Sequence, residues 1–271
     1  MLHRQAAASG MRQTSRLRDR CATSASSGFA FIAFFCDTAR MSYPGGKGRA
    51  YQRLINLMPP HDVFIETHLG GGAIMLHKRR ATRNIGIDAD INVIAAWRER
   101  DDAGIELVHG DAADYLRSTP LAPGTLVFCD PPYWPSSRRR ARCYRCDYDA
   151  GDHLRLLATL TDLPCQVMIT GYPSDAYAAA LSGWHVTDYP NCTQTGLVTE
   201  KAWTNYAPPV VLHDYDHLGM DFREREALRR RRTSHVRKLQ RAPALERNAI
   251  LADLADAFPD ELKLAVRRHG R

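Results

Sequence analysis

Four short apolar segments, each followed at once or within a few residues by a carboxylate, limit what this 271-residue chain can fold into. They span residues 63–65, 85–87, 106–108 and 126–129, and the acids near their ends are Glu66, Asp88, Asp111 and Asp130. Runs of this length are typical of buried parallel strands, and the segments between them are long enough for crossover helices. We therefore predict an α/β fold: a Rossmann-like, doubly wound, mostly parallel sheet whose carboxyl edge brings the four acids to one crevice.

The last of these segments runs directly into Asp130-Pro131-Pro132-Tyr133. Proline lacks a backbone N–H and fixes φ, so the chain must leave the sheet at Asp130. A capping aspartate in a proline turn would explain the pattern structurally. The alternative is a pocket for a flat, amino-bearing base. There Asp130 and the Pro131 carbonyl would accept hydrogen bonds from the exocyclic amine, and Tyr133 would stack on the ring.

Two glycine-rich turns precede predicted helices. Residues 43–48 (Tyr-Pro-Gly-Gly-Lys-Gly) lack the spacing of a phosphate-binding P-loop, and a plain loop is the alternative there. Gly70-Gly71-Gly72 follows the first strand without completing the G-x-G-x-x-G pattern, yet it lets a cofactor lie against the backbone. Asp88 ends the second strand, 22 residues after Glu66, where an acid suits a ribose diol.

The formal net charge of +7 is unevenly distributed. Residues 1–40, 134–150 and 213–271 carry +4, +3 and +4, which leaves −4 for the remainder. Basic appendages on a mildly acidic core favour a polyanion such as nucleic acid, and solvated arginine-rich faces are the alternative. Directly after Tyr133 we predict a flap that binds nucleic acid, with a plain basic loop as the alternative; its contact residues would be Arg138, Arg139, Arg140, Arg142, Tyr144 and Arg145.

Cysteine usage and hydropathy indicate whether to expect a metal site or a membrane segment. Among seven cysteines the one close pair is Cys143 and Cys146, with no second pair to complete a zinc site, so we expect reduced thiols and no metal. No apolar run approaches the roughly 20 residues of a membrane helix, so no membrane association is expected.

Composition divides the chain into three parts. Residues 1–40 are predicted to be a non-native or disordered extension upstream of a natural start at Met41, with a targeting peptide as the alternative. Residues 41–212 form the predicted catalytic domain, completed by a strand at 166–172 and an antiparallel hairpin. Residues 213–271 are predicted to be a basic helical hairpin that contacts the DNA backbone or packs as a surface appendage. Its second helix would bury a stripe made of Leu245, Ile250, Leu251, Leu254 and Phe258.

The ordered motifs carry a resemblance. Tyr-Pro-Gly-Gly-Lys, Glu-x-x-x-Gly-Gly-Gly, Asp-x-Asp-x-x-Val-Ile, Gly-Asp and Asp-Pro-Pro-Tyr together resemble Dam-type, phage and prophage-like DNA adenine-N6 methyltransferases. The resemblance covers about residues 43–206. It implies a class I methyltransferase fold, S-adenosyl-L-methionine as cofactor, DNA as partner, a monomer, and the cytoplasm of a bacterial or phage-infected cell.

Individual roles follow from the matched positions. The resemblance assigns cofactor contacts to Tyr43, Gly45, Gly46, Lys47, Glu66, Gly70, Gly72, Asp88 and Asp111, and the catalytic loop to Asp130, Pro131, Pro132 and Tyr133. Two departures stand out. Thr67-His68 replaces the family's usual Pro-Phe, and the 18 residues between Asp111 and Asp130 leave no room for a target-recognition domain.

These observations lead to one expected activity. It is transfer of a methyl group from S-adenosyl-L-methionine to N6 of an adenine flipped out of the duplex. Methylation of RNA, of a protein amide or of cytosine N4, and a catalytically silent DNA binder, remain the alternatives.

Overall fold

The computed structural model describes residues 46–100, 104–135, 146–193 and 196–269. The chain divides after Ala39 into two units, and every described residue belongs to the second, Arg40–Arg271. No helix among the described residues is both long and apolar enough to cross a membrane.

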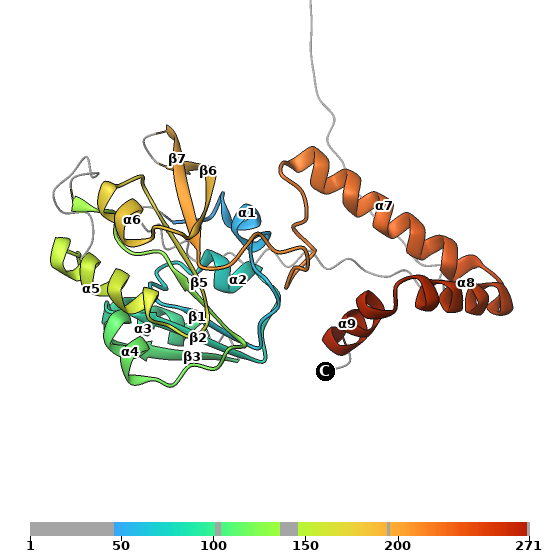
Figure 1. Cartoon of the computed structure of the whole chain (residues 1–271), viewed down its shortest axis with the longest axis horizontal. Helices are drawn as coiled ribbons and strands as arrows, with labels where there is room; N and C mark the ends of the chain where they lie inside the picture. Colours follow the sequence, from blue (N-terminus) through green and yellow to red (C-terminus); the bar gives the residue numbers. More distant parts are fainter. Residues whose placement is uncertain (1–45, 101–103, 136–145, 194–195, 270–271) are drawn as a thin grey trace, which may run out of the picture. The chain divides into compact units, whose positions relative to one another are not determined.

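A seven-stranded sheet organises the second unit (Figure 1). Its strand order is β3-β2-β1-β4-β5-β7-β6, with the first five strands parallel and β7 antiparallel to both neighbours. The strands are β1 Val63–Glu66, β2 Arg83–Asp88, β3 Ile105–His109, β4 Thr125–Cys129, β5 Gln166–Gly171, β6 His185–Thr193 and β7 Gly196–Thr204. This is the Rossmann-like, mostly parallel α/β sheet that the sequence predicted, closed by the expected antiparallel hairpin.

Helices cover both faces of the sheet, as a doubly wound fold requires. One apolar core joins the sheet to α4 (Ala112–Ser118), α5 (Ala150–Thr161) and α6 (Asp175–Ala180). The other joins it to α1 (Tyr51–Ile55), α2 (Ala73–His77) and α3 (Ile91–Glu99). Alternate residues of β4 serve the two cores, because successive side chains of a strand point to opposite faces. This is why a central strand needs a continuous apolar run, and all five residues of β4 are buried.

The strand order places a topological switch point between β1 and β4. Beyond β1 the chain builds the sheet outward through β2 and β3, and it then returns to add β4 and β5 on the opposite side. In open α/β sheets, ligands bind in the crevice beyond the carboxyl ends of the strands at such a point. Glu66 and Asp130 stand at those two strand ends, so the fold itself directs attention to them.

The C-terminal region differs from the prediction. It forms three helices, α7 (Phe222–Arg241), α8 (Ala244–Ala257) and α9 (Pro259–His269), where a two-helix hairpin was expected. The apolar stripe predicted to be buried on the second helix is not buried. Leu245 is 86% exposed, Phe258 is 50% exposed, and no residue of α7 or α8 is buried. The spacing of apolar residues indicated a helix correctly but could not supply a surface for it to pack on.

Candidate active site

Carboxylates gather at the carboxyl edge of the sheet, around the switch point. Glu66 and Asp88 end the neighbouring strands β1 and β2, and Asp130 follows β4 on the other side of β1. Burial, together with the negative charges of Asp130 and Asp88, raises the pKa of Glu66 to about 8. Glu66 therefore lies close enough to Asp130 and Asp88 to be repelled by both, and a cation bound beside Glu66 would relieve that repulsion.

Asp130 is anchored through a single oxygen. Its Oδ1 receives the Lys47 ammonium at 2.6 Å and the Thr170 hydroxyl at 2.8 Å. No residue that the structure describes donates to its Oδ2, and the side chain keeps 18% exposure. Burial raises the pKa of Asp130 above its ordinary value, and Lys47 counters part of that rise. The arrangement fixes the carboxylate plane and leaves one oxygen available to a ligand.

Glu200 is a fully buried carboxylate that the sequence analysis did not select. It accepts hydrogen bonds from Tyr133 (2.8 Å), Tyr189 (2.6 Å) and Asn191 (2.8 Å), and it pairs with Lys47 at 3.1 Å. Burial acts to raise its pKa, but Lys47 and the three donors outweigh burial and hold the pKa below its ordinary value. Glu200 thus connects Lys47 to the Asp-Pro-Pro-Tyr loop as a charged group.

Lys47 lies between these two acids. The resemblance assigns it to the cofactor motif, but its ammonium contacts Asp130 and Glu200, and its side chain is 3% exposed. Burial acts to lower its pKa, yet the two carboxylates, Asp130 first, raise it well above the ordinary value. Lys47 therefore carries a positive charge that helps to position Asp130.

Tyr133, the tyrosine of the Asp-Pro-Pro-Tyr loop, is held at both ends. Its hydroxyl donates to Glu200, and its ring stacks on Tyr172 with centroids 4.1 Å apart and an interplanar angle of 26°. Tyr172 directly follows β5, the strand next to β4. Pro131 is buried and Pro132 is half-buried, so the two prolines anchor the start of the loop that carries Tyr133.

The predicted cofactor side of the crevice is organised by backbone donors. Asp88 accepts the N–H of Gly70 at Oδ2 (2.9 Å) and the N–H of Asp90 at Oδ1 (2.8 Å). Each carboxylate oxygen has two lone pairs, so each can accept one further donor such as a sugar hydroxyl. Burial raises the pKa of Asp88, and the two N–H donors oppose that rise.

Side-chain packing also requires glycine in the turn at Gly70-Gly71-Gly72. Gly72 has φ +59°, and a Cβ there would lie 2.1 Å from the Trp97 ring. The Trp97 indole also donates to the Gly70 carbonyl at 2.9 Å. Gly72 is thus required for contact with α3, which is a structural role that the motif alone did not reveal.

Asp111 has several partners on its own side of the sheet. It caps α4 by accepting the N–H of Asp114 (3.0 Å), and it also pairs with Arg155 (3.1 Å) and accepts the Tyr148 hydroxyl (3.2 Å). Burial acts to raise its pKa, but the Asp114 N–H and Arg155 outweigh it and lower the pKa. These contacts are sufficient to explain an acid at this position, and they leave little capacity for a ligand.

The substitution of Thr67-His68 for the family's Pro-Phe places a polar ring in the crevice. The His68 Nδ1 lies 2.8 Å from the Thr67 hydroxyl, and burial lowers the pKa of His68 to about 3, so the ring is neutral. Its Nε2 is buried and has no hydrogen-bond partner among the described residues. The expected apolar contact is replaced by a ring with one polar atom still unsatisfied.

Several predicted site residues lie outside the described part of the chain. They are Tyr43 and Gly45 from the first glycine-rich turn and Arg138, Arg139, Arg140, Arg142, Tyr144 and Arg145 from the flap. Gly46 is described and exposed, next to the buried Lys47. The nucleic-acid contacts assigned to the flap therefore stay a prediction.

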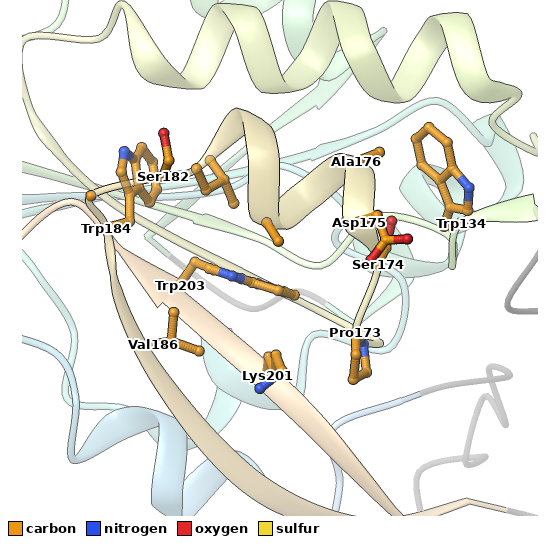
Figure 2. Close-up of a pocket in the computed structure, with 13 residues that line it drawn as sticks. Trp134, Pro173, Ser174, Asp175, Ala176, Ser182, Trp184, Val186, Lys201 and Trp203 are labelled. Carbon is orange, nitrogen blue, oxygen red and sulfur yellow. The ribbon is translucent and has the colours of Figure 1, made fainter.

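A groove of about 800 Å³ adjoins the catalytic loop. Figure 2 shows Trp203 below α6, with Trp134 near the Ser174 end of that helix and Trp184 near the other end. Trp134 follows Tyr133 in the chain, so one end of the groove reaches the loop. The clustered carboxylates do not line it, and the groove is therefore distinct from the crevice at the switch point.

Metal-ligating side chains are not clustered in the described ranges. These ranges contain no cluster of three or more His, Cys, Asp or Glu side chains that could hold a metal ion.

Comparisons with known proteins give distant similarities to solved structures alone. No family model matches the chain, and no curated protein sequence matches it. Among solved structures, an rRNA methylase from Streptococcus thermophilus is 11% identical, with a TM-score of 0.42 over 57% of this chain and 94% of that one. Precorrin 8w decarboxylase from Methanobacterium thermoautotrophicum is 15% identical, with a TM-score of 0.40 over 61% and 94%. A dimethyladenosine transferase from Plasmodium falciparum is 14% identical, with a TM-score of 0.40 over 60% and 64%. Likenesses of this size do not extend to substrate or cofactor.

Proposed function

We propose that this protein transfers a methyl group from S-adenosyl-L-methionine to N6 of an adenine in DNA. The observation that carries the proposal is the state of Asp130 at the switch point. Lys47 and Thr170 hold its Oδ1, while Oδ2 has no partner among the described residues. An Asp-Pro-Pro-Tyr loop with one free carboxylate oxygen suits an exocyclic amine, which brings two N–H donors to acceptors in the plane of a base.

The crevice has features that fit the proposed cofactor. Bound S-adenosyl-L-methionine would supply an electrophilic methyl group on a sulfonium cation. Glu66, Asp88 and Asp130 form an acidic environment that favours a cation, and both oxygens of Asp88 retain capacity for ribose hydroxyls. The Gly70 and Gly72 turn brings backbone without side chains to the same edge.

The residues of the loop would orient the amine. In the proposed complex, Asp130 Oδ2 and the Pro131 carbonyl each accept one N–H of N6, which turns the nitrogen lone pair out of conjugation with the ring. The Tyr133 ring holds the base by stacking. When the N6–methyl bond has formed and the bond from methyl to sulfur has broken, N6 is acidic and its surplus proton passes to Asp130. Orientation and electrostatics at the amine provide most of the acceleration.

Asp130 is suited to this role by its environment. Burial raises its pKa, so it can take up a proton more readily than an exposed aspartate. Lys47 keeps that rise limited, so the carboxylate remains charged and able to accept hydrogen bonds before the transfer.

DNA and adenine are the finer parts of the proposal. They are supported by the ordered motifs of the resemblance, by aspartate rather than serine before the two prolines, and by the basic charge outside the central domain. RNA and cytosine N4 present chemically similar amines, and a silent binder would share the same charges, so the test must separate these outcomes.

The test uses purified full-length protein with S-adenosyl-L-methionine and unmethylated DNA, followed by digestion to nucleosides and mass spectrometry. N6-methyladenine should form, and Asp130→Ala should abolish it. Asp253→Asn, which removes an exposed acid on α8, is the matched control and should keep full activity.

Each other outcome redirects the assignment. N4-methylcytosine would replace adenine as the target, and methylated RNA would replace DNA as the substrate. Cofactor binding without any methylated product would contradict a nucleic-acid methyltransferase.

A further inference from the structure

The longest helix of the described chain, α7, has an unusual concentration of positive charge. Its 20 residues carry nine cationic and two acidic side chains, which give it a formal charge of +7. The whole chain has the same formal net charge. No residue of α7 is buried, so burial of an apolar face does not account for the sequence of this helix.

The helix has an inner and an outer face. On the inner face, Arg225 donates to the Gly219 carbonyl (3.5 Å), Arg232 donates to the Tyr215 carbonyl (2.7 Å), and Leu228 and Leu239 are half-buried. Residues two positions apart lie about 200° apart around an α-helix, so Arg223 faces away from Arg225. The face opposite these contacts is therefore open to solvent.

Four arginines form a stripe along that outer face. Arg223, Arg230 and Arg237 repeat every seven residues, which returns to nearly the same side of the helix, and Arg241 follows one turn later. All four are exposed. The stripe extends over about 27 Å, from 18 residues at about 1.5 Å each. We call these four residues the α7 stripe.

One acid partly offsets the stripe, because Asp221 lies near Arg223 at the start of α7. Acidic residues do not neutralise the other three arginines. The two glutamates of α7 are both engaged elsewhere: Glu224 accepts the Met220 N–H (2.8 Å), and Glu226 pairs with Arg229 (2.8 Å). Within the described residues, the side chains of Arg230, Arg237 and Arg241 make no salt bridge or hydrogen bond to protein. The positive field of the stripe is thus directed outward.

We propose that the α7 stripe binds the phosphate backbone of double-stranded DNA without reading its sequence. The proposal rests on the proposed function, which requires DNA to be held while one base leaves the stack. Eight of the nine cations of α7 are arginine, whose planar guanidinium matches phosphate in two-pronged contacts. An anionic membrane surface would need a large apolar face beside the cations, but the positions between the stripe arginines are Ala227 and Ser234.

The test measures binding of full-length protein to a short fluorescent duplex by anisotropy over a salt series, with no cofactor present. The variant is Arg230→Gln/Arg237→Gln/Arg241→Gln, in which glutamine preserves helix propensity and circular dichroism confirms the fold. The control is Arg80→Gln/Arg98→Gln/Arg100→Gln, which removes the same charge at exposed positions outside α7, in the loop before β2 and at the end of α3.

Each phosphate contact contributes about 0.9 to the slope of log affinity against log salt, so the stripe variant should flatten that slope by about 2.7. The control should leave the slope nearly unchanged. Equal slopes in the wild type and the stripe variant would overturn the proposal, and so would an equal effect of the control. Binding to phosphatidylserine vesicles without binding to the duplex would also overturn it.

The design separates this proposal from the proposed function. Salt-sensitive duplex binding that the stripe variant loses, without any methylated base in the product assay, would support the stripe and refute the methyltransferase. Methylated base in the product assay, together with an unchanged salt slope in the stripe variant, would support the methyltransferase and refute the stripe.

Discussion

Replacing Lys47 with methionine should reveal how strongly the buried charges of the crevice depend on one ammonium. Methionine is unbranched and roughly as long as the lysine stem, so the substitution removes charge and retains most of the packing. It leaves Asp130 and Glu200 close to each other with no cation between them.

The distances set the magnitude. At an effective dielectric constant of about 20, an ammonium at 2.6 Å and 3.1 Å attracts the two carboxylates by about 6 and about 5 kcal/mol. Desolvation of the three buried ions offsets much of this attraction. Removing one member of a buried pair typically destabilises a protein by about 3–5 kcal/mol, and we expect a loss in that range at neutral pH.

The loss should depend on pH in a defined direction. Without Lys47 the pKa values of both carboxyls rise, and a carboxyl whose folded pKa exceeds its unfolded pKa loses stabilising effect as the pH rises through the folded value. The variant should therefore be closer to wild type at about pH 5 than at about pH 8. Glu200→Gln in the same chain should recover part of the loss, because it removes one of the two opposed charges.

Urea unfolding followed by circular dichroism measures these differences. Lys201→Met is the matched control, since Lys201 pairs with Asp188 at 2.7 Å, but both side chains are partly exposed. An exposed pair contributes about 0–1 kcal/mol, so the control should change stability little. If Lys47→Met were no more destabilising than the control, or more destabilising at acid pH, the buried-network account would be refuted.

Three further predictions follow. Glu66→Gln should flatten a rise in S-adenosyl-L-methionine affinity between about pH 7 and 9, measured by calorimetry. The reason is that Glu66, with a pKa of about 8, loses its proton there and then attracts the cation; equal pH profiles would contradict this. Gly72→Ala should destabilise the fold by about 2 kcal/mol or more in urea unfolding, because its Cβ would lie 2.1 Å from Trp97 at a positive φ. The control Gly48→Ala should be neutral, because a Cβ at Gly48 has no atom within 4 Å. In the methylation assay, Tyr133→Phe should lower the activity less than about tenfold and Tyr133→Ala about 10- to 100-fold, because stacking on the ring contributes about 1–3 kcal/mol per base. Equal losses of activity in the two variants would assign the role to the hydroxyl instead.

The central sheet was predictable because its signals are local. An apolar run bounded by turn residues becomes a buried strand under nearly any packing, and Pro131 and Pro132 cannot continue one. Strands β1 to β5 therefore lie within a few residues of their predicted bounds. The strand-end acids converge because parallel strands share one carboxyl edge, which is a property of the fold class rather than of any particular contact.

The charged network at Asp130 was not predictable in the same way. Glu200 lies 70 residues after Asp130, on a strand where an acid would ordinarily face solvent. Its burial depends on β7 pairing with β5 and β6 and on Tyr133, Tyr189 and Asn191 meeting around it. The alternation of its own strand contained no signal of that kind, and Lys47 likewise depends on a contact across the sheet.

For the C-terminal helices, helix formation was predictable but burial was not. Helix propensity and the absence of proline are local, so the sequence predicted helices in the region where α7 and α8 form. Burial of an apolar stripe requires a second surface, which no residue within the helix can specify, and Leu245 is 86% exposed. The sequence by itself thus determined the strands of the sheet, helices α7 and α8 and the Asp-Pro-Pro-Tyr turn, because each depends on neighbouring residues. Only the tertiary structure decided that Lys47 and Glu200 hold Asp130 and Tyr133, because buried charges find their partners in space rather than along the chain.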